Sequence, residues 1–151
     1  MVLLQRHLHP GRCGPRRPQR HFVREGAGLG YPRSRRPSGG LWSSVTDLLA
    51  VGEGLLADRA RLDDIRRPRT TPDDPVVYGL GWALGPSDRM YLDGRLPGCR
   101  AAMFLIPDKD YVSVLVTNQQ RALRATASAL SDMQQSLTND NLATAMARFA
   151  A

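Results

Sequence analysis

The chain has 151 residues, of which 42% are hydrophobic. It can therefore bury the core of one domain, but it is too short for two ordinary domains. No apolar run approaches the roughly 18 residues of a membrane-spanning helix, which excludes a membrane span. Polar residues follow directly after Met1–Leu4, so the sequence predicts no signal peptide in this chain; the location is unknown, with cytoplasmic as the default. Cys13 and Cys99 lie in unlike contexts, and we do not expect them to pair.

Positive charge is concentrated at the start of the chain. Residues 1–36 contain nine arginines and one glutamate, a formal charge of +8, whereas the remaining residues are close to neutral. The same segment has many prolines and glycines and no hydrophobic period of either kind. We therefore predict that residues 1–37 form a disordered arginine- and proline-rich arm and that residues 38–151 form the folded domain.

The first predicted helix follows the change of composition at Ser38-Gly39-Gly40. Ser43 or Ser44 can cap it, and Asp47 would lie in its first turn, where the helix dipole favours a carboxylate. Apolar residues then recur at helical spacing, which predicts a helix to about Ala57. Residues 58–75 are polar and contain three prolines, so we expect a loop with at most one helical turn.

Strands dominate the next part of the chain. Val76–Leu84 is predicted to be one strand, Gly85–Asp88 a turn, and Arg89–Leu92 the start of the next strand. Ala101–Ile106 and Tyr111–Thr117 form a further strand pair around a short turn. Both of these strands are apolar on both faces, which indicates a sheet that is covered on both sides.

Helices are expected again after the last strand. Residues 121 to about 136 have a helical apolar pattern, and a second helix is expected to begin after Thr138 or Asn139. The first of these helices places four apolar residues near one face, namely Leu123, Ala127, Leu130 and Leu137. The predicted fold class is therefore α/β of the α+β type, a partial antiparallel sheet with flanking helices.

The segment Met90–Gly98 carries the main candidate site. In it a short strand runs into Gly-x-x-Pro-Gly, which leaves the main chain bare, and main-chain N–H groups of this kind can bind a substrate carbonyl. The candidate residues of this substrate and oxyanion strand are Leu92, Asp93, Gly94 and Arg95. The alternative is an ordinary strand-to-loop turn in which Gly94 and Gly98 adopt positive φ.

Five short motifs occur in a characteristic order. They are Pro37-Ser38-Gly39-Gly40-Leu41-Trp42-Ser43-Ser44, Asp47-Leu48, Tyr78-Gly79-Leu80-Gly81-Trp82, Asp93-Gly94-x-x-Pro97-Gly98 and Val116-Thr117-Asn118. The series resembles the C-terminal part of the serine β-lactamase and penicillin-binding-protein superfamily, in particular its class C and esterase-like branch. The resemblance covers about residues 36–120 and implies a serine acyl-enzyme mechanism of amide or ester hydrolysis.

The resemblance also assigns roles to residues. It places the family's third motif, Lys/His-x-Gly, on Leu92-Asp93-Gly94, so that a leucine stands where the family has a lysine or histidine. The N–H group of Arg95 would occupy the oxyanion position. The two other motifs, Ser-x-x-Lys and Tyr-x-Asn, are absent from the chain.

These departures lead to the expectation of a truncated serine hydrolase that has no catalytic residue of its own and is inactive alone. Half of a split enzyme and a non-catalytic binding module remain as alternatives. We expect the chain to associate with a missing N-terminal half or with itself, because without the helices of that half its central strands would be uncovered.

Other classes of site have weaker support. His7, His9, Cys13 and His21 match no common zinc-site spacing, so neither a metal nor a cofactor is expected. Ser43 and Ser44 suit a helix cap better than a nucleophile. The arginines of the arm could bind nucleic acid, but few aromatic residues lie among them, and we expect no specific nucleic-acid partner.

Overall fold

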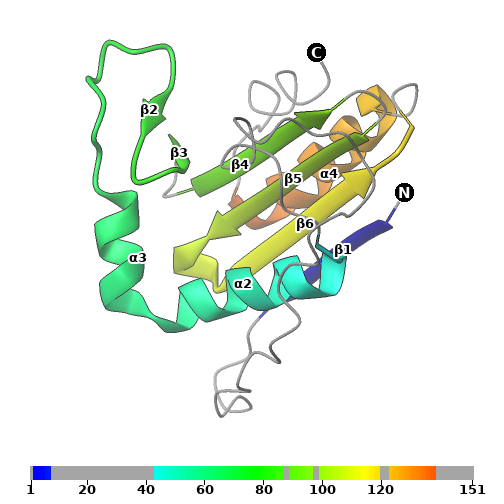
Figure 1. Cartoon of the computed structure of the whole chain (residues 1–151), viewed down its shortest axis with the longest axis horizontal. Helices are drawn as coiled ribbons and strands as arrows, with labels where there is room; N and C mark the ends of the chain where they lie inside the picture. Colours follow the sequence, from blue (N-terminus) through cyan, green and yellow to red (C-terminus); the bar gives the residue numbers. More distant parts are fainter. Residues whose placement is uncertain (1, 8–42, 87–88, 97–98, 120–122, 139–151) are drawn as a thin grey trace, which may run out of the picture.

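The computed structural model describes residues 2–7, 43–86, 89–96, 99–119 and 123–138, and the structural statements that follow concern these residues. They form one antiparallel sheet with the strand order β1-β6-β5-β4-β3-β2 (Figure 1). The strands are β1 (Val2–His7), β2 (Val77–Tyr78), β3 (Ala83–Gly85), β4 (Arg89–Leu96), β5 (Cys99–Ile106) and β6 (Tyr111–Thr117). The helices are α2 (Val45–Ala57), α3 (Arg59–Arg66) and α4 (Leu123–Thr138). This mixture confirms the predicted α+β fold class.

Helix α2 begins as its sequence predicts. The Ser44 hydroxyl accepts a hydrogen bond from the Asp47 N–H at 3.1 Å and donates one to the Asp47 carboxylate at 2.8 Å. One N–H group of the first turn, which has no partner inside the helix, is satisfied in this way. The helix ends at Ala57, the predicted residue. The capping serine and the apolar periodicity together made both ends of this helix predictable.

Helix α3 corrects the expectation that residues 58–75 hold at most one helical turn. It has eight residues, and the Asp58 carboxylate caps it by accepting a hydrogen bond from the Arg61 N–H at 3.1 Å. Its sequence is mostly charged, but Leu62 and Ile65, three positions apart, are both buried. A helix that buries only this narrow stripe gives a weak periodic signal.

The two faces of the sheet are covered by different helices. In Figure 1, α2 lies in front of the sheet and α4 behind it. On β6, Val112 and Val114 join the core beneath α2 and α3, whereas Leu115 joins the core beneath α4. The predicted covering of both faces is confirmed. The expectation of uncovered, edge-like central strands is wrong, because β5 and β6 both lie inside the sheet and this chain's own helices pack over them.

Helix α2 lies very close to the centre of the sheet. A side chain at Gly52 would overlap the Val112 side chain, whereas one at Gly54 would meet no atom within 4 Å. Gly52 is buried and Gly54 is exposed. The helix therefore needs glycine at the first position to pack against β6, but not at the second.

Strand β1 corrects the predicted arm for residues 2–7. These residues pair antiparallel with β6, from Val2 opposite Val116 to His7 opposite Tyr111. Residues 8–37 of the predicted arm lie outside the described residues. The pairing was not visible in the local sequence because β1 joins a strand more than one hundred residues later in the chain.

The predicted strand Val76–Leu84 is instead a hairpin. Val77 pairs with Leu84 and Tyr78 with Ala83, and the four residues between them form the turn. Gly81 adopts a φ of 77°, which residues with side chains rarely do. The Leu80 N–H donates to the Ile65 carbonyl at 2.8 Å and ties the turn to α3.

A small polar cluster lies within the core beneath α4. Tyr111, Ser113 and Gln134 are all fully buried, and the Gln134 amide donates to the Ser113 hydroxyl at 2.9 Å. Burial raises the pKa of Tyr111 above its usual value of 10.0, and hydrogen bonds from Ser113 and Gln134 partly oppose that rise. The cluster fixes α4 on the sheet by hydrogen bonds as well as by apolar contact.

Two further expectations fall in this part of the chain. The predicted helix over residues 121–136 is confirmed as α4, in which Ala127 and Leu130 are buried. The structure does not describe the side chains of Leu123 and Leu137, nor the second predicted helix. Within the described ranges, no helix is long and apolar enough to cross a membrane.

Candidate functional site

Strand β4 has two different halves. Up to Tyr91, it pairs with β3 on one side and with β5 on the other. Tyr91 itself is opposite Ala83 of β3 and Phe104 of β5. Strand β3 has no residue paired beyond that point, so residues 92–96 pair with β5 alone among the described strands. Figure 1 shows β3 beside only the first part of β4. Among the described strands, none pairs with the outer edge of the second half, which we call the open edge.

The predicted site residues all lie in this open half. Leu92 is opposite Met103 and Gly94 is opposite Ala101, while Asp93 and Arg95 alternate with them along the strand. Because side chains alternate across a strand, Leu92 and Gly94 share the face that carries α2 and α3. Asp93 and Arg95 point to the other face, where Arg95 Nε lies 3.7 Å from Asp93 Oδ2.

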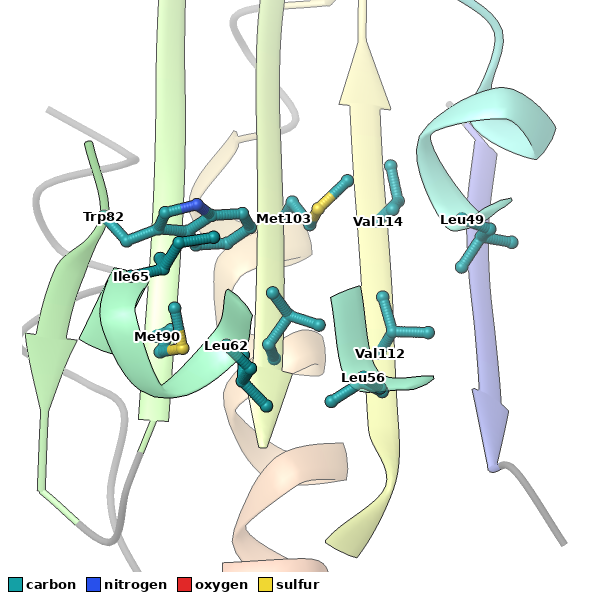
Figure 2. Close-up of a cluster of buried hydrophobic side chains, with 10 residues drawn as sticks. Leu49, Leu56, Leu62, Ile65, Trp82, Met90, Met103, Val112 and Val114 are labelled. Atoms are coloured by element: carbon teal, nitrogen blue, oxygen red, sulfur yellow. The ribbon is translucent and has the colours of Figure 1, made fainter. Parts of the chain in front are cut away.

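The face that carries Leu92 is apolar. Leu92 is 38% exposed, but its partner Met103 is only 6% exposed and belongs to the core beneath α2 and α3. Figure 2 shows Trp82 of the same core lying across β4, with its ring directed toward Met103. Leu92 thus extends the apolar surface of the core to the open edge.

Gly94 has no structural requirement for glycine. The structure contradicts the alternative of positive φ at Gly94, since Gly81 is the glycine with positive φ within the described segments, and Gly98 lies outside them. A side chain at Gly94 would meet no atom within 4 Å. Glycine inside a strand weakens it, and it is typical of places where a ligand or another main chain approaches closely.

The open half of β4 can contribute main-chain groups to a binding site. An exposed strand edge offers N–H and C=O groups to an extended ligand. Ser44 is engaged in capping α2, and Ser113 is fully buried against Gln134. Neither serine can therefore act as a nucleophile at β4.

Other candidates from the sequence are not brought together. His7 lies in β1, whereas His9, Cys13 and His21 fall outside the described residues. No group of three potential metal ligands occurs within the described ranges. The sequence also did not reveal that the open edge begins at Leu92. The available signal was the pair of glycines in the turn at residues 79–82, because this turn limits the length of the β2–β3 hairpin.

Comparison with known families agrees with this geometry. The model of the family described as Beta-lactamase matches residues 5–135, a range that includes the second half of β1, the whole open edge of β4 and most of α4. The match also includes residues 5–37 of the predicted arm, nearly all of which lie before the range of the resemblance found in the sequence. No curated protein matches the sequence significantly. Because the family model covers most of the chain, the chain belongs to the beta-lactamase family.

Proposed function

We propose that this chain supplies the substrate-binding strand of a serine hydrolase and does not hydrolyse substrate by itself. The Beta-lactamase match supports a serine hydrolase family. The observation that carries the proposal is Gly94, a strand glycine with extended backbone and open space on its side-chain face. Together with the open edge of residues 92–96, it provides room for a substrate carbonyl and its flanking main chain.

The lack of activity follows from the sequence. Neither Ser-x-x-Lys nor Tyr-x-Asn occurs in the chain, and Leu92 occupies the position of the family's lysine or histidine. An oxyanion-binding strand has no effect on rate without a nucleophile and a base to use it. We propose that the chain is the truncated or split part of such an enzyme and that a nucleophile-bearing partner would complete it.

Two measurements test these statements. The purified chain should not hydrolyse a chromogenic β-lactam or p-nitrophenyl butyrate above the rate in buffer. Saturable turnover that an active-site serine reagent abolishes would refute the proposal that the chain is inactive by itself. Binding is tested separately: an acetylated and amidated alanine tripeptide should shift the amide resonances of residues 92–96 in the ¹⁵N-labelled chain.

Matched variants sharpen the binding test. Gly94→Val fills the open space on β4 and should abolish these shifts. Gly54→Ala adds a side chain to the other glycine that has open space, on α2, and should leave the shifts unchanged. If the tripeptide moves no β4 resonance in the unaltered chain, the substrate-strand proposal fails.

A non-catalytic binding module is the second candidate. It is favoured by the covering of both sheet faces by α2, α3 and α4, which gives the chain a core without a partner. A monodisperse monomer with one sharp thermal transition would favour this module, whereas dye binding and self-association would favour half of a split enzyme.

A role in nucleic-acid binding would depend on the basic residues 1–36, most of which lie outside the described residues. It requires affinity that falls steeply with salt and disappears when residues 1–36 are removed. The structure gives no observation that favours it over the two candidates above.

A further inference from the structure

We propose that Gly79 joins helix α3 to the β2–β3 hairpin and that the resulting unit sets the point on β4 where pairing with β3 ends. Gly79 belongs to the motif Tyr78-Gly79-Leu80-Gly81-Trp82, to which the proposed function gives no role. The inference makes Gly79 a positioning residue for the substrate-binding strand, and that part of it rests on the proposed function.

The end of α3 needs a hydrogen-bond donor from outside the helix. The last four carbonyl groups of an α-helix have no partner within it, and the Ile65 carbonyl is one of them. Because Ile65 is buried, leaving this carbonyl unpaired would cost free energy. The Leu80 N–H donates to its oxygen at 2.8 Å. The hairpin turn therefore supplies the donor that the helix end requires.

This contact requires a glycine next to the donor. A Cβ atom at Gly79 would overlap the Ile65 carbonyl oxygen and would lie 3.2 Å from the carbonyl carbon. Both atoms belong to the main chain, so they cannot turn aside as the end of a flexible side chain can. A Cβ atom at Gly85, on the same hairpin, would have Arg89 Cβ as its nearest neighbour at 3.6 Å, an ordinary van der Waals distance. The close approach of hairpin and helix therefore depends on Gly79.

Two further hydrogen bonds tie the hairpin to the chain that follows α3. The Arg69 N–H donates to the Tyr78 carbonyl at 2.7 Å, and the Tyr78 N–H donates to the Thr70 hydroxyl at 2.9 Å. The side chains of Ile65 and Trp82 both join the core beneath α2 and α3 (Figure 2). Helix α3 and the hairpin are therefore linked by main-chain hydrogen bonds and by a shared core.

The unit acts on β4 through strand β3. Residues 83–85 pair with residues 89–91 of β4, and no described strand pairs with the outer side of β4 beyond Tyr91. Movement of the hairpin away from α3 would remove the partner of residues 89–91 and lengthen the open edge. Trp82 lies across β4 (Figure 2), so the same movement would disturb the face that carries Leu92.

Hydrogen exchange in the unaltered chain tests whether the unit exists. Amide exchange is measured at rising urea concentrations below the unfolding transition, and the opening free energy of α3 is compared with that of residues 77–85. The two values should coincide and lie below that of β5 and β6, because one unit opens as a whole. Separate opening of the helix and the hairpin would overturn the inference. This measurement needs no substitution that could prevent folding.

The variants Gly79→Ala and Gly85→Ala test the role of the glycine itself. Gly79→Ala should raise the exchange rates of the protected amides in residues 83–85 and 89–91 by at least about tenfold, while those in β5 and β6 stay unchanged. Gly85→Ala is the matched control and should leave all of these rates within about twofold of the unaltered chain. Equal effects of the two substitutions would contradict a special role of Gly79.

The alanine tripeptide separates this inference from the proposed function. In Gly79→Ala, the resonances that it shifts should extend from residues 92–96 to residues 89–91, which a loss of stability alone would not produce. Shifts still confined to residues 92–96, although residues 83–85 exchange faster, would reject the positioning role. If the tripeptide shifts no resonance in the unaltered chain, the substrate-strand proposal fails, and the exchange measurements still decide whether Gly79 joins α3 to the hairpin.

Discussion

The centre of the sheet and the open half of β4 use the same residue types for opposite purposes. At the centre, Leu105 is fully buried and Gly52 lets α2 approach Val112. On the open half, Leu92 is exposed and Gly94 borders empty space. Side chains at the centre are therefore constrained by close packing, whereas side chains on the open half can contact a ligand. Substitutions of matched residues in the two regions separate stability from binding.

The largest expected difference is between two leucine truncations. Leu105→Ala removes a fully buried side chain and should lower the free energy of unfolding by about 2–5 kcal/mol. Leu92→Ala removes a side chain that is 38% exposed and should cost about 0.5 kcal/mol or less. Urea unfolding followed by circular dichroism measures both values. Equal losses would show that β4 is packed along its whole length.

The next difference is between two glycines on α2. Gly52→Ala should destabilise the chain by roughly 1–3 kcal/mol, because its methyl group would overlap Val112. Gly54→Ala meets no neighbouring atom and should stabilise the helix by about 0.5–1 kcal/mol. Opposite shifts of the thermal midpoint are the expected result. A stabilising Gly52→Ala would mean that α2 lies farther from β6 than the structure shows.

A smaller effect is expected from pH at the centre of the sheet. Burial raises the pKa of Tyr111, so the folded chain holds this proton more tightly than the unfolded chain does. The resulting stability is complete below about pH 10, the usual tyrosine pKa, and is lost as pH rises through the higher folded-state value. Denaturation midpoints measured from pH 8 upward should therefore fall at alkaline pH. Tyr111→Phe should show a shallower fall, and an identical fall would exclude Tyr111 as its cause.

The smallest effect on stability is expected at Gly94. Gly94→Ala fits without contact and should change the free energy of unfolding by about 0.5 kcal/mol or less. Its methyl group nevertheless enters the space assigned to the ligand, so peptide titration should show weaker binding. A stability loss as large as that of Gly52→Ala would indicate that Gly94 is a packing residue.

The elements that could be predicted from the sequence are those with strong local signals. Helix α2 has a capping serine and a long apolar stripe, and β5 and β6 are short apolar runs on either side of a turn. Helix α3 was missed because its buried stripe consists of two residues within a charged segment. The β2–β3 hairpin was predicted as one strand because its apolar residues continue through the turn glycines.

The strand that carries the candidate site could be located for the same reason. Gly94, Pro97 and Gly98 identified the strand locally, and the structure places Leu92–Arg95 together on its open half. The open edge itself depends on where β3 stops pairing, which is a property of two segments and not of one. The side on which Leu92 lies likewise required the register with Met103.

The pairing of β1 with β6 has a consequence for how the chain is made. Val2 is synthesised before its partner Val116, which follows 114 residues later. At translation rates of about 5–20 residues per second, β1 waits roughly 6–23 s before β6 exists. The helix α2 and the β4–β5 hairpin can form during that interval, but β1 can join the sheet only after β6 has been made. Such distant pairing slows folding, so refolding from denaturant should be limited by docking of the first strand.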